Sequence, residues 1–336
     1  MKGQWNDKIF SVTGTSFEGL ALEIFRFQYD HNMLYKAYAD MLGVGPLNIS
    51  RLDEIPFLPI HFFKTHPVKT TEFEPQTVFE SSGTTQTGNS HHLLKEIELY
   101  RQSFMKGFEL FYGPVKDWCI IGLLPSYLER KNSSLVFMVD ELIKQSHQPQ
   151  SGFYLNEFEN LHEVLKDLEE KKQKTLLVGV TFALFDLAEK YTLPLHHTTI
   201  METGGMKGRR EEMIRQELHE FLQTKFKVDV IHSEYGMTEL LSQAYSPGNG
   251  IFHCPPWMKV LVRDEEDPLQ VLSPELIAAS QSPTRTGIIN VIDLANIYSC
   301  SFIATDDAAK LHADGSFEVL GRIDNSDIRG CSLLMV

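Results

Sequence analysis

The stretch that decides the fold is Val228-Asp229-Val230-Ile231-His232-Ser233-Glu234-Tyr235-Gly236-Met237-Thr238-Glu239. The apolar run over 228–231 predicts a strand, so the polar residues after it should lie at its carboxyl end, where open α/β sheets bind ligands. The ring of Tyr235 can cover a planar base, and Thr238 and Glu239 can reach a phosphate and its Mg²⁺. The residues alone leave a second interpretation open, an ordinary helix start with Thr238 or Glu239 in its first turn.

Upstream of this stretch, apolar runs alternate with amphipathic segments at intervals of about 20 to 30 residues, which predicts βαβ crossovers and a mainly parallel sheet. The segment 258–320 differs, because it holds short β-rich pieces and turns, and it predicts a smaller β-rich subdomain. The predicted strands are 119–124, 176–180, 198–202 and 228–232, then 260–262, 288–292 and 301–303; the predicted helices are 133–143, 182–190, 209–226 and a short one from about 237.

The N-terminal part is predicted to open with a helix of about 25 residues from Thr15, ending by Gly43 or Gly45. Prolines and aromatic residues over 46–67 favour an extended connector that lies across a hydrophobic surface. We therefore predict a large α/β domain over 1–257, a β-rich subdomain over 258–324 and a tail over 325–336.

The composition excludes several classes of protein. The 336 residues are 42 % hydrophobic and 23 % charged, which excludes a generally disordered chain and a small disulfide-rich domain. A net charge of −14 argues against generic binding to nucleic acid or anionic lipid, since both need a basic face. The four cysteines are far apart and are expected to be reduced thiols. The N-terminus lacks an apolar signal core and no run is long enough to span a membrane, so we expect a cytoplasmic protein.

Two further kinds of motif suit a nucleotide. Ser81-Ser82-Gly83-Thr84-Thr85-Gln86-Thr87-Gly88 offers backbone N–H groups and hydroxyls to an oxyanion, although it is not a Walker loop and could be only a flexible turn. Beyond it, His91 and His92 are expected to face solvent or to donate to phosphate. In Thr305-Asp306 the carboxylate can accept two ribose hydroxyls, and Arg322 in Gly321-Arg322-Ile323-Asp324 can bridge ribose and phosphate. Either could instead be a surface turn.

The order and spacing of these motifs, with Gly204-Gly205 between them, resemble the adenylate-forming superfamily of acyl-CoA synthetases, peptide-synthetase adenylation domains and luciferases over about 75–330. Within that superfamily the chain is most similar to the LuxE-type acyl-protein synthetases, through Ile55-Pro56-Phe57-Leu58-Pro59 and the ending Ile328-Arg329-Gly330-Cys331-Ser332-Leu333. Phenylacetate-CoA ligases are next nearest. The resemblance implies an α/β fold, the large N-terminal domain of these enzymes, without their mobile C-terminal domain.

The resemblance also implies roles for individual residues. Glu239 would bind Mg²⁺, and Thr238 would contact the α-phosphate of ATP. The other nucleotide-binding residues would be Ser81, Ser82, Gly83, Thr84 and Thr85 at the β- and γ-phosphates, Gly204 and Gly205 at the adenine and the acyl carboxylate, Tyr235 with Gly236 at the adenine, and Asp306 and Arg322 at the ribose.

The implied function is ATP-dependent activation of a fatty carboxylic acid to acyl-AMP, followed by transfer of the acyl group to a protein thiol. LuxE-type proteins are acylated on a cysteine near the C-terminus, which here would be Cys331, and an acyl-reductase or another acceptor protein would be the partner. The residues alone allow Cys331 to be a small buried hydrophobe. Gln86 replaces the family's usual glycine, and Tyr127 only loosely matches a residue near the acyl carboxylate. An acyl- or aryl-CoA ligase and a non-catalytic nucleotide- or acyl-binding protein remain alternatives.

Overall fold

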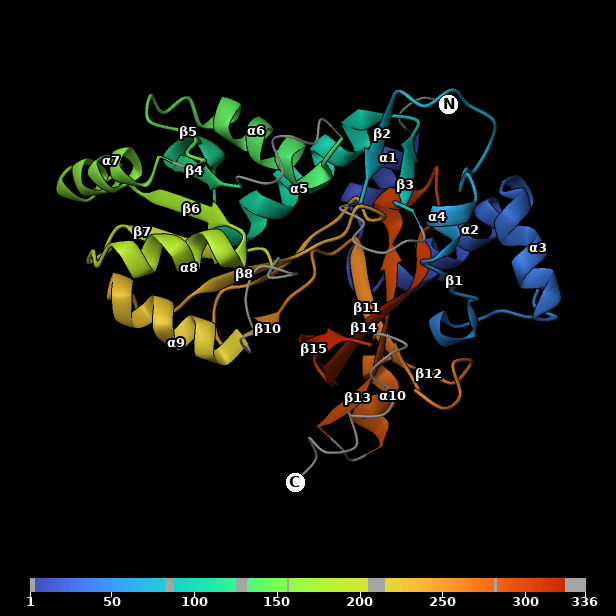
Figure 1. The fold of residues 1–336 in the computed structure, drawn as a ribbon. Coiled ribbons are helices and arrows are strands. Elements are labelled where there is room, and N and C mark those ends of the chain that lie inside the picture. Colours follow the sequence, from blue (N-terminus) through green and yellow to red (C-terminus); the bar gives the residue numbers. More distant parts are fainter. Residues whose placement is uncertain are drawn as a thin grey trace.

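The computed structural model describes residues 4–81, 88–124, 132–155, 157–204, 215–280 and 283–323. Two sheets lie side by side, and the first is mainly parallel, as predicted (Figure 1). Its strands, in spatial order, are β5 (Gly152–Phe153), β4 (Cys119–Leu123), β6 (Thr175–Gly179), β7 (Thr198–Glu202), β8 (His232–Tyr235) and β9 (Ala244–Ser246). Every residue of β4 and β6 is buried, which explains why these strands are apolar runs rather than alternating patterns. Only β9 pairs in the antiparallel sense.

Helices cover both faces of this first sheet (Figure 1). The predicted helices at 133–143 and 182–190 are confirmed, and the one predicted over 209–226 is described from residue 215 onward. On one side lie α5 (Ile97–Tyr112) and α6 (Ser134–Ser146), and on the other α8 (Thr181–Lys190) and α9 (Arg215–Phe226); α7 (Phe158–Glu170) leads into β6, and the short helix η2 (Val115–Asp117) precedes β4.

The second sheet is antiparallel, apart from one short strand, and its long strands exceed the predicted pieces. The pieces predicted at 288–292 and 301–303 belong to strands of 10 and 11 residues. In spatial order the strands are β10 (Ile251–Phe252), β15 (Phe317–Arg322), β14 (Phe302–His312), β13 (Thr284–Asp293), β11 (Met258–Arg263) and β12 (Val271–Leu272), with helix α10 (Pro274–Ala279) and the short helix η3 (Leu294–Asn296) beside them. The predicted boundary between residues 257 and 258 stays a prediction.

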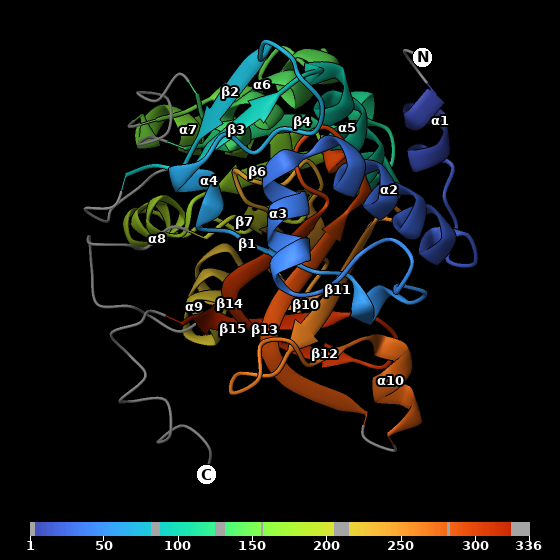
Figure 2. The same ribbon diagram turned by 90° about the vertical axis from the view of Figure 1, so that its right-hand side faces the viewer.

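The prediction of a single long N-terminal helix is wrong. The structure instead has two helices, α2 (Phe17–His31) and α3 (Met33–Met41), after a short α1 (Gln4–Phe10). Asn32 separates them in an extended conformation, and its side chain accepts a hydrogen bond from the backbone N–H of Tyr35. A capping side chain of this kind starts a new helix in a new direction. Both helices lie on the near side of Figure 2, in front of the second sheet.

Gln28 fastens α2 to the second sheet. Its side-chain nitrogen donates to the carbonyls of Asn296 and Ile297 at 3.1 and 3.0 Å, and its oxygen accepts from the backbone N–H of Ser301 at 2.9 Å. The side chain is fully buried, so all of these bonds replace water. The N-terminal helices are therefore part of the same packed unit as the chain's last strands.

The proline-rich connector contains short helices and a strand, and it packs against the second sheet. It contains the short helix η1 (Leu52–Glu54), the strand β1 (Leu58–Pro59) and the helix α4 (Phe62–Thr65). The strand pairs in parallel with residues 303–304 of β14, and Phe57, Leu58 and Phe63 are buried, so the expected hydrophobic docking is confirmed. The hairpin of β2 (Thr77–Glu80) and β3 (His91–Leu94) follows.

The strand predicted at 228–232 lies further along the chain, and the prediction of a short helix from about residue 237 is wrong. β8 begins at His232, and residues 238–239 form a turn before β9. The backbone N–H groups of Leu241 and Ser242 donate to the carboxylate of Asp293 at 2.7 and 3.0 Å. A helix would need those groups for its own hydrogen bonds, so this distant carboxylate selects the turn.

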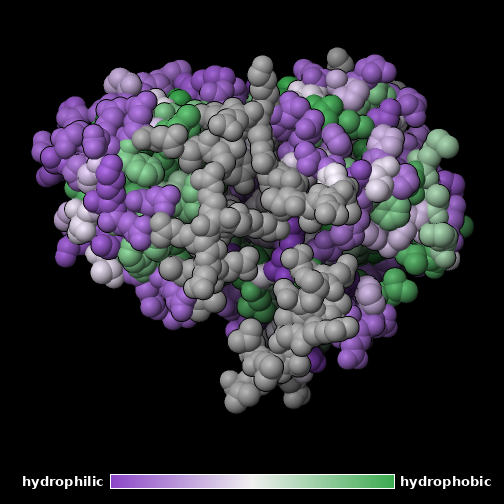
Figure 3. Space-filling view, in the orientation of Figure 1, coloured by the Kyte–Doolittle hydropathy of each residue, from purple (hydrophilic) through white to green (hydrophobic). Residues whose placement is uncertain are grey.

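Among the described residues, no helix is long and apolar enough to cross a membrane. Large exposed apolar side chains occur on α3 and just after it, at Met33, Met41 and Leu47. Hydrophobic surface is visible on the right of Figure 3, the side on which α3 lies in Figure 1.

Candidate functional site

The carboxyl end of β8 meets the second sheet at one hydrogen bond. The hydroxyl of Tyr235 donates to Oδ2 of Asp307 over 2.9 Å, and Nε of Arg322 lies 3.4 Å from Oδ1 of the same carboxylate. Asp307 and Arg322 are paired across β14 and β15, which places them on the same face of that sheet. An aromatic ring, a carboxylate and a guanidinium thus converge at the junction of the two sheets.

Asp306, the residue predicted for the ribose, belongs to a different contact. Its Oδ2 lies 3.3 Å from Nε2 of His61 on the connector, whereas Asp307 contacts Tyr235 and Arg322. Neighbouring residues of a strand point to opposite faces, so only one of two consecutive aspartates can share the face of Arg322. Sequence reasoning missed Asp307, and the signal that could have found it was this alternation counted back from Arg322.

The ring of Tyr235 is held firmly. It is 8 % exposed and packs edge-to-face against Phe317, with ring centroids 5.5 Å apart. Burial and the charge of Asp307 raise the pKa of Tyr235 well above its ordinary value, so the hydroxyl keeps its proton and acts as a donor. The structure therefore fixes the orientation of the aromatic residue that the sequence singled out.

Gly236 follows, with the carboxyl of Glu234 directly beside its backbone. A Cβ atom at this position would lie 2.4 Å from Oε1 of Glu234, so the Glu234 side chain would have to shift to admit one. Burial and the nearby charge of Glu202 raise the pKa of Glu234 to about 8, so this carboxyl is mostly protonated at neutral pH. A neutral acid thus packs against the backbone of the motif.

Glu239 is a buried carboxyl among cations. It is 5 % exposed, and burial raises its pKa, while the hydroxyl of Ser90 and the charges of Arg322 and Lys64 act in the opposite direction. Lys64 belongs to α4 and was not anticipated, because only the pairing of β1 with β14 brings α4 here. The site therefore combines one buried carboxyl with the charges of Arg322 and Lys64.

His92 lies beneath the turn rather than in solvent, where it had been expected. Its Nδ1 is 2.8 Å from the carbonyl oxygen of Thr238, and its Nε2 is 2.9 Å from Oδ1 of Asn296. Burial lowers the pKa of His92 to about 4, so the ring is neutral near pH 7. His91, one residue earlier, points the other way and is exposed, as the alternation of a strand requires.

Two described residues that flank the predicted phosphate loop, Ser81 and Ser90, are hydrogen-bonded to each other. The N–H of Ser81 donates to the carbonyl of Ser90 at 3.1 Å, and the N–H of Ser90 donates to Oγ of Ser81 at 2.9 Å. The loop itself, with Ser82, Gly83, Thr84, Thr85 and Gln86, lies outside the described residues, as do Tyr127, Gly205 and Cys331.

Gly204 follows the end of β7 with a φ of +74°, a conformation that favours glycine. Its N–H donates to Glu202 at 2.8 Å, and that carboxylate also contacts Ser233 and Arg215. Burial opposes ionisation of Glu202, but His219, whose Nε2 lies 3.9 Å from its carboxylate, and the charge of Arg215 outweigh it and lower the pKa of Glu202 to about 2. This charged group holds Gly204 beside β8.

The chain matches the model of one protein family, "Acyl-protein synthetase, LuxE", over residues 15–336. The chain belongs to this family. The long-chain-fatty-acid–luciferin-component ligase of Aliivibrio fischeri is 22 % identical over 344 residues, which cover 94 % of this chain and 86 % of that protein. The predicted LuxE-type resemblance is thereby confirmed, and membership of a ligase family supports acyl activation.

Solved structures of adenylate-forming enzymes share the fold. ATP-bound MatB from Rhodopseudomonas palustris superposes with a TM-score of 0.53 and 16 % identity over 75 % of this chain and 50 % of its own. An ATP-bound chimera described as RpMatB-BxBclM B3 superposes with a TM-score of 0.54 and 16 % identity, over 75 % of this chain and 49 % of its own. This LuxE-family chain spans about half the length of those structures, and the predicted α/β fold is confirmed.

Proposed function

We propose that this protein activates a carboxylic acid, of the long-chain fatty type, with ATP, and passes the acyl group from acyl-AMP to a protein thiol. The convergence of Tyr235, Asp307 and Arg322 beside the buried carboxyl of Glu239 carries the proposal. An aromatic ring, a ribose-binding carboxylate, a guanidinium and a metal-binding carboxylate are the groups that a magnesium nucleotide needs. Membership of the LuxE family supports an acyl-protein synthetase.

In this proposal the nucleotide lies at the sheet junction. The base would cover Tyr235 and Gly236, Arg322 would reach the ribose, and Thr238 the α-phosphate. For the ribose hydroxyls we propose Asp307 in place of the predicted Asp306, because Asp307 shares a face with Arg322. The β- and γ-phosphates would be held by Ser81, Ser82, Gly83, Thr84 and Thr85, and the adenine and acyl carboxylate would lie near Gly204 and Gly205.

The residues fit Mg²⁺ held jointly with the phosphates of ATP. The described residues contain no cluster of three or more His, Cys, Asp or Glu side chains that could hold a metal alone. Mg²⁺ usually keeps several waters and takes one or two protein carboxylates besides phosphate oxygens, which Glu239 can supply. When bound, the ion would neutralise charge on the phosphates.

The first step would be attack of a substrate carboxylate oxygen on the α-phosphorus. A new P–O bond forms, the bond from the α-phosphorus to the bridging oxygen breaks, and pyrophosphate leaves with the electron pair. A carboxylate and a triphosphate repel each other, and this repulsion costs several kcal/mol in a partly desolvated site. Lys64 and Arg322 offset it, and Thr238 and Tyr235 keep the nucleotide in line.

The second step would be thioester formation. The sulfur of Cys331, as thiolate, attacks the carbonyl carbon of the acyl-AMP, the bond from that carbon to the phosphate oxygen breaks, and AMP leaves. The thiol proton passes to solvent. A thiol with an ordinary pKa is only a few per cent ionised at neutral pH, but it is nucleophilic enough for a mixed anhydride.

We expect pyrophosphate release that depends on Mg·ATP and on a carboxylic acid but requires no CoA. The measurement is coupled pyrophosphate detection with a panel of acids from acetate and phenylacetate to hexadecanoate. Release only after CoA is added would favour a CoA ligase. Binding of ATP without release for any acid would favour a non-catalytic nucleotide-binding protein.

Asp307→Asn should raise the KM for ATP by about 10- to 100-fold, because a hydrogen bond to a charged group contributes about 1.5–3 kcal/mol. Asp306→Asn is the matched variant on the opposite face, and its effect should be several-fold smaller. Steady-state kinetics at saturating acid compare the two. The reverse order would return the ribose to Asp306.

A further inference from the structure

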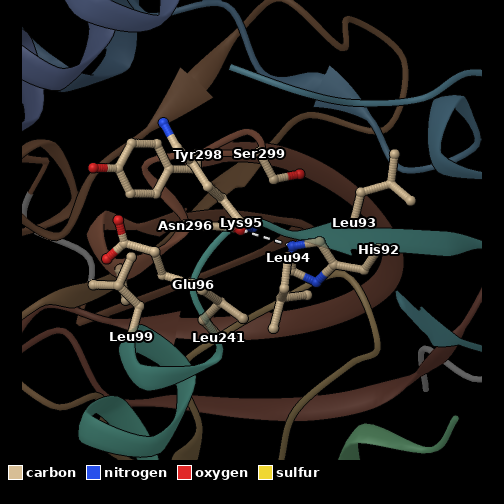
Figure 4. Close-up of a pocket in the computed structure, with 11 residues that line it drawn as sticks. His92, Leu93, Leu94, Lys95, Glu96, Leu99, Leu241, Asn296, Tyr298 and Ser299 are labelled. Carbon is tan, nitrogen blue, oxygen red and sulfur yellow. Dashed lines mark hydrogen bonds between the residues drawn. The ribbon is translucent and has the colours of Figure 1, made fainter. Parts of the chain in front are cut away.

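One pair of side chains holds both peptide groups that flank Glu239. The ring of His92 contacts the carbonyl of Thr238 through Nδ1 at 2.8 Å, and Nδ2 of Asn296 donates to the carbonyl of Glu239 itself, also at 2.8 Å. The two side chains meet at 2.9 Å, the contact that is dashed in Figure 4. Two peptide planes fixed on either side of one Cα atom leave the carboxylate of Glu239 little freedom of direction.

The pair is buried but not tightly enclosed. His92 and Asn296 are each 1 % exposed, and a small pocket lies against them, lined also by Leu99, Leu241 and Tyr298 (Figure 4). The ring is held by its two hydrogen-bond contacts, to Thr238 and to Asn296. Phe63 of α4 meets the ring edge-to-face at 5.8 Å.

His92 also belongs to the hairpin that carries the predicted phosphate loop. It lies on β3, two residues after Ser90, which is hydrogen-bonded to Ser81. The hydroxyl of Ser90 acts on the carboxyl of Glu239. The hairpin thus contacts the backbone of the Thr238–Glu239 turn through His92, and it also carries Ser90, whose hydroxyl partly offsets the rise that burial causes in the pKa of Glu239.

We propose that His92 is a positioning residue, which directs the carboxylate of Glu239 toward Mg²⁺ and couples that carboxylate to the phosphate hairpin. The inference rests on the proposed function in one respect, the assignment of Mg²⁺ to Glu239. Outer partners of this kind typically change metal affinity or activity by about 10- to 100-fold when they are removed.

The contact with Thr238 is the one that matters in this proposal. A neutral imidazole has one N–H, while both of its nitrogens here face oxygen atoms. Only a hydrogen on Nδ1 bonds the turn directly, and one on Nε2 would bond Asn296 alone. In His92→Asn the amide nitrogen can take the place of Nδ1, and in His92→Gln the longer side chain reaches the place of Nε2.

The test is the affinity of the full chain for ATP, measured by equilibrium dialysis with Mg²⁺ and with EDTA. In His92→Leu, which keeps the volume but has no donor, the Mg²⁺ concentration for half-maximal tightening of ATP binding should rise about 10- to 100-fold. Binding without metal should stay within about twofold. His92→Asn should resemble the wild type, and His92→Gln should resemble His92→Leu. His91→Leu, on the exposed face of the same strand, is the control.

A merely structural role would change binding equally with and without Mg²⁺, and that result overturns the proposal. The proposal is also overturned if His92→Gln behaves as the wild type while His92→Asn does not. It is overturned as well if the affinity of the wild type for ATP does not depend on Mg²⁺. If His92→Leu fails to fold in thermal unfolding, the comparison of His92→Asn with His92→Gln decides. A wild type that binds Mg·ATP but releases no pyrophosphate with any acid would refute the proposed function and leave this test intact.

Discussion

Glu239→Gln should lower acid-dependent pyrophosphate release by about 100- to 1,000-fold, the usual loss when one preorganised electrostatic group is removed from a reacting phosphate. Gln keeps the shape of the side chain, which is buried beneath the site, and removes its charge. Raising Mg²⁺ should recover only part of the rate, because an amide oxygen binds Mg²⁺ poorly compared with a carboxylate. Coupled pyrophosphate detection over a Mg²⁺ series measures both effects.

Glu234→Gln is the matched control for this change. It removes a carboxyl five residues earlier, one whose raised pKa of about 8 already keeps it mostly neutral at pH 7. Its pyrophosphate release should stay within about threefold of the wild type. Equal losses in the two variants would point to general damage to the turn and would withdraw the metal-binding role of Glu239.

Cys331→Ser should abolish the acyl label that the wild type acquires from ATP, Mg²⁺ and a radiolabelled long-chain acid. A thiol tethered near the site has an effective concentration of the order of millimolar, so self-acylation should compete well with release of acyl-AMP. A serine hydroxyl is far less ionised at neutral pH and should not replace it. Sensitivity of the wild-type label to hydroxylamine identifies the thioester, and pyrophosphate should still form for at least one turnover.

The remaining cysteines supply the controls for that experiment. Cys119 and Cys300 are buried in the structure, and burial raises the pKa of Cys300 and of Cys254 to about 12, so none of the three is suited to nucleophilic attack. Cys254→Ser should therefore keep the full label. Label that persists in Cys331→Ser, or that maps to Cys254 by peptide analysis, would return Cys331 to the small buried hydrophobe that its neighbours also allow.

The parts of the fold that could be predicted are those with a strong local pattern. The apolar runs at 119–124, 176–180 and 198–202 became β4, β6 and β7 with nearly the predicted bounds, and the amphipathic segments between them became helices. Buried parallel strands have a continuous apolar signature that needs no knowledge of their neighbours. The Tyr235 motif differs in part, because its residues up to Tyr235 form β8 itself instead of following a strand at 228–232.

The features that were missed depend on distant residues. The turn at 238–239 replaces a helix because Asp293 takes the N–H groups of Leu241 and Ser242. His92 is buried because Thr238 and Asn296, about 150 and 200 residues further along the chain, contact it. The choice between Asp306 and Asp307 depended on strand register, which a local motif does not contain.

The hydrogen bonds of Gln28 to the segment 296–301 also affect the order in which the chain can fold during synthesis. The partners lie 268 to 273 residues further along the chain. At a synthesis rate of about 5 to 20 residues per second, α2 emerges roughly 15 to 50 s before its partners do. During that interval the face of α2 that bears Ile24 and Phe25 has no sheet to pack against. Helix α2 is thus made long before its native partners, and its apolar face stays exposed in the nascent chain for that interval.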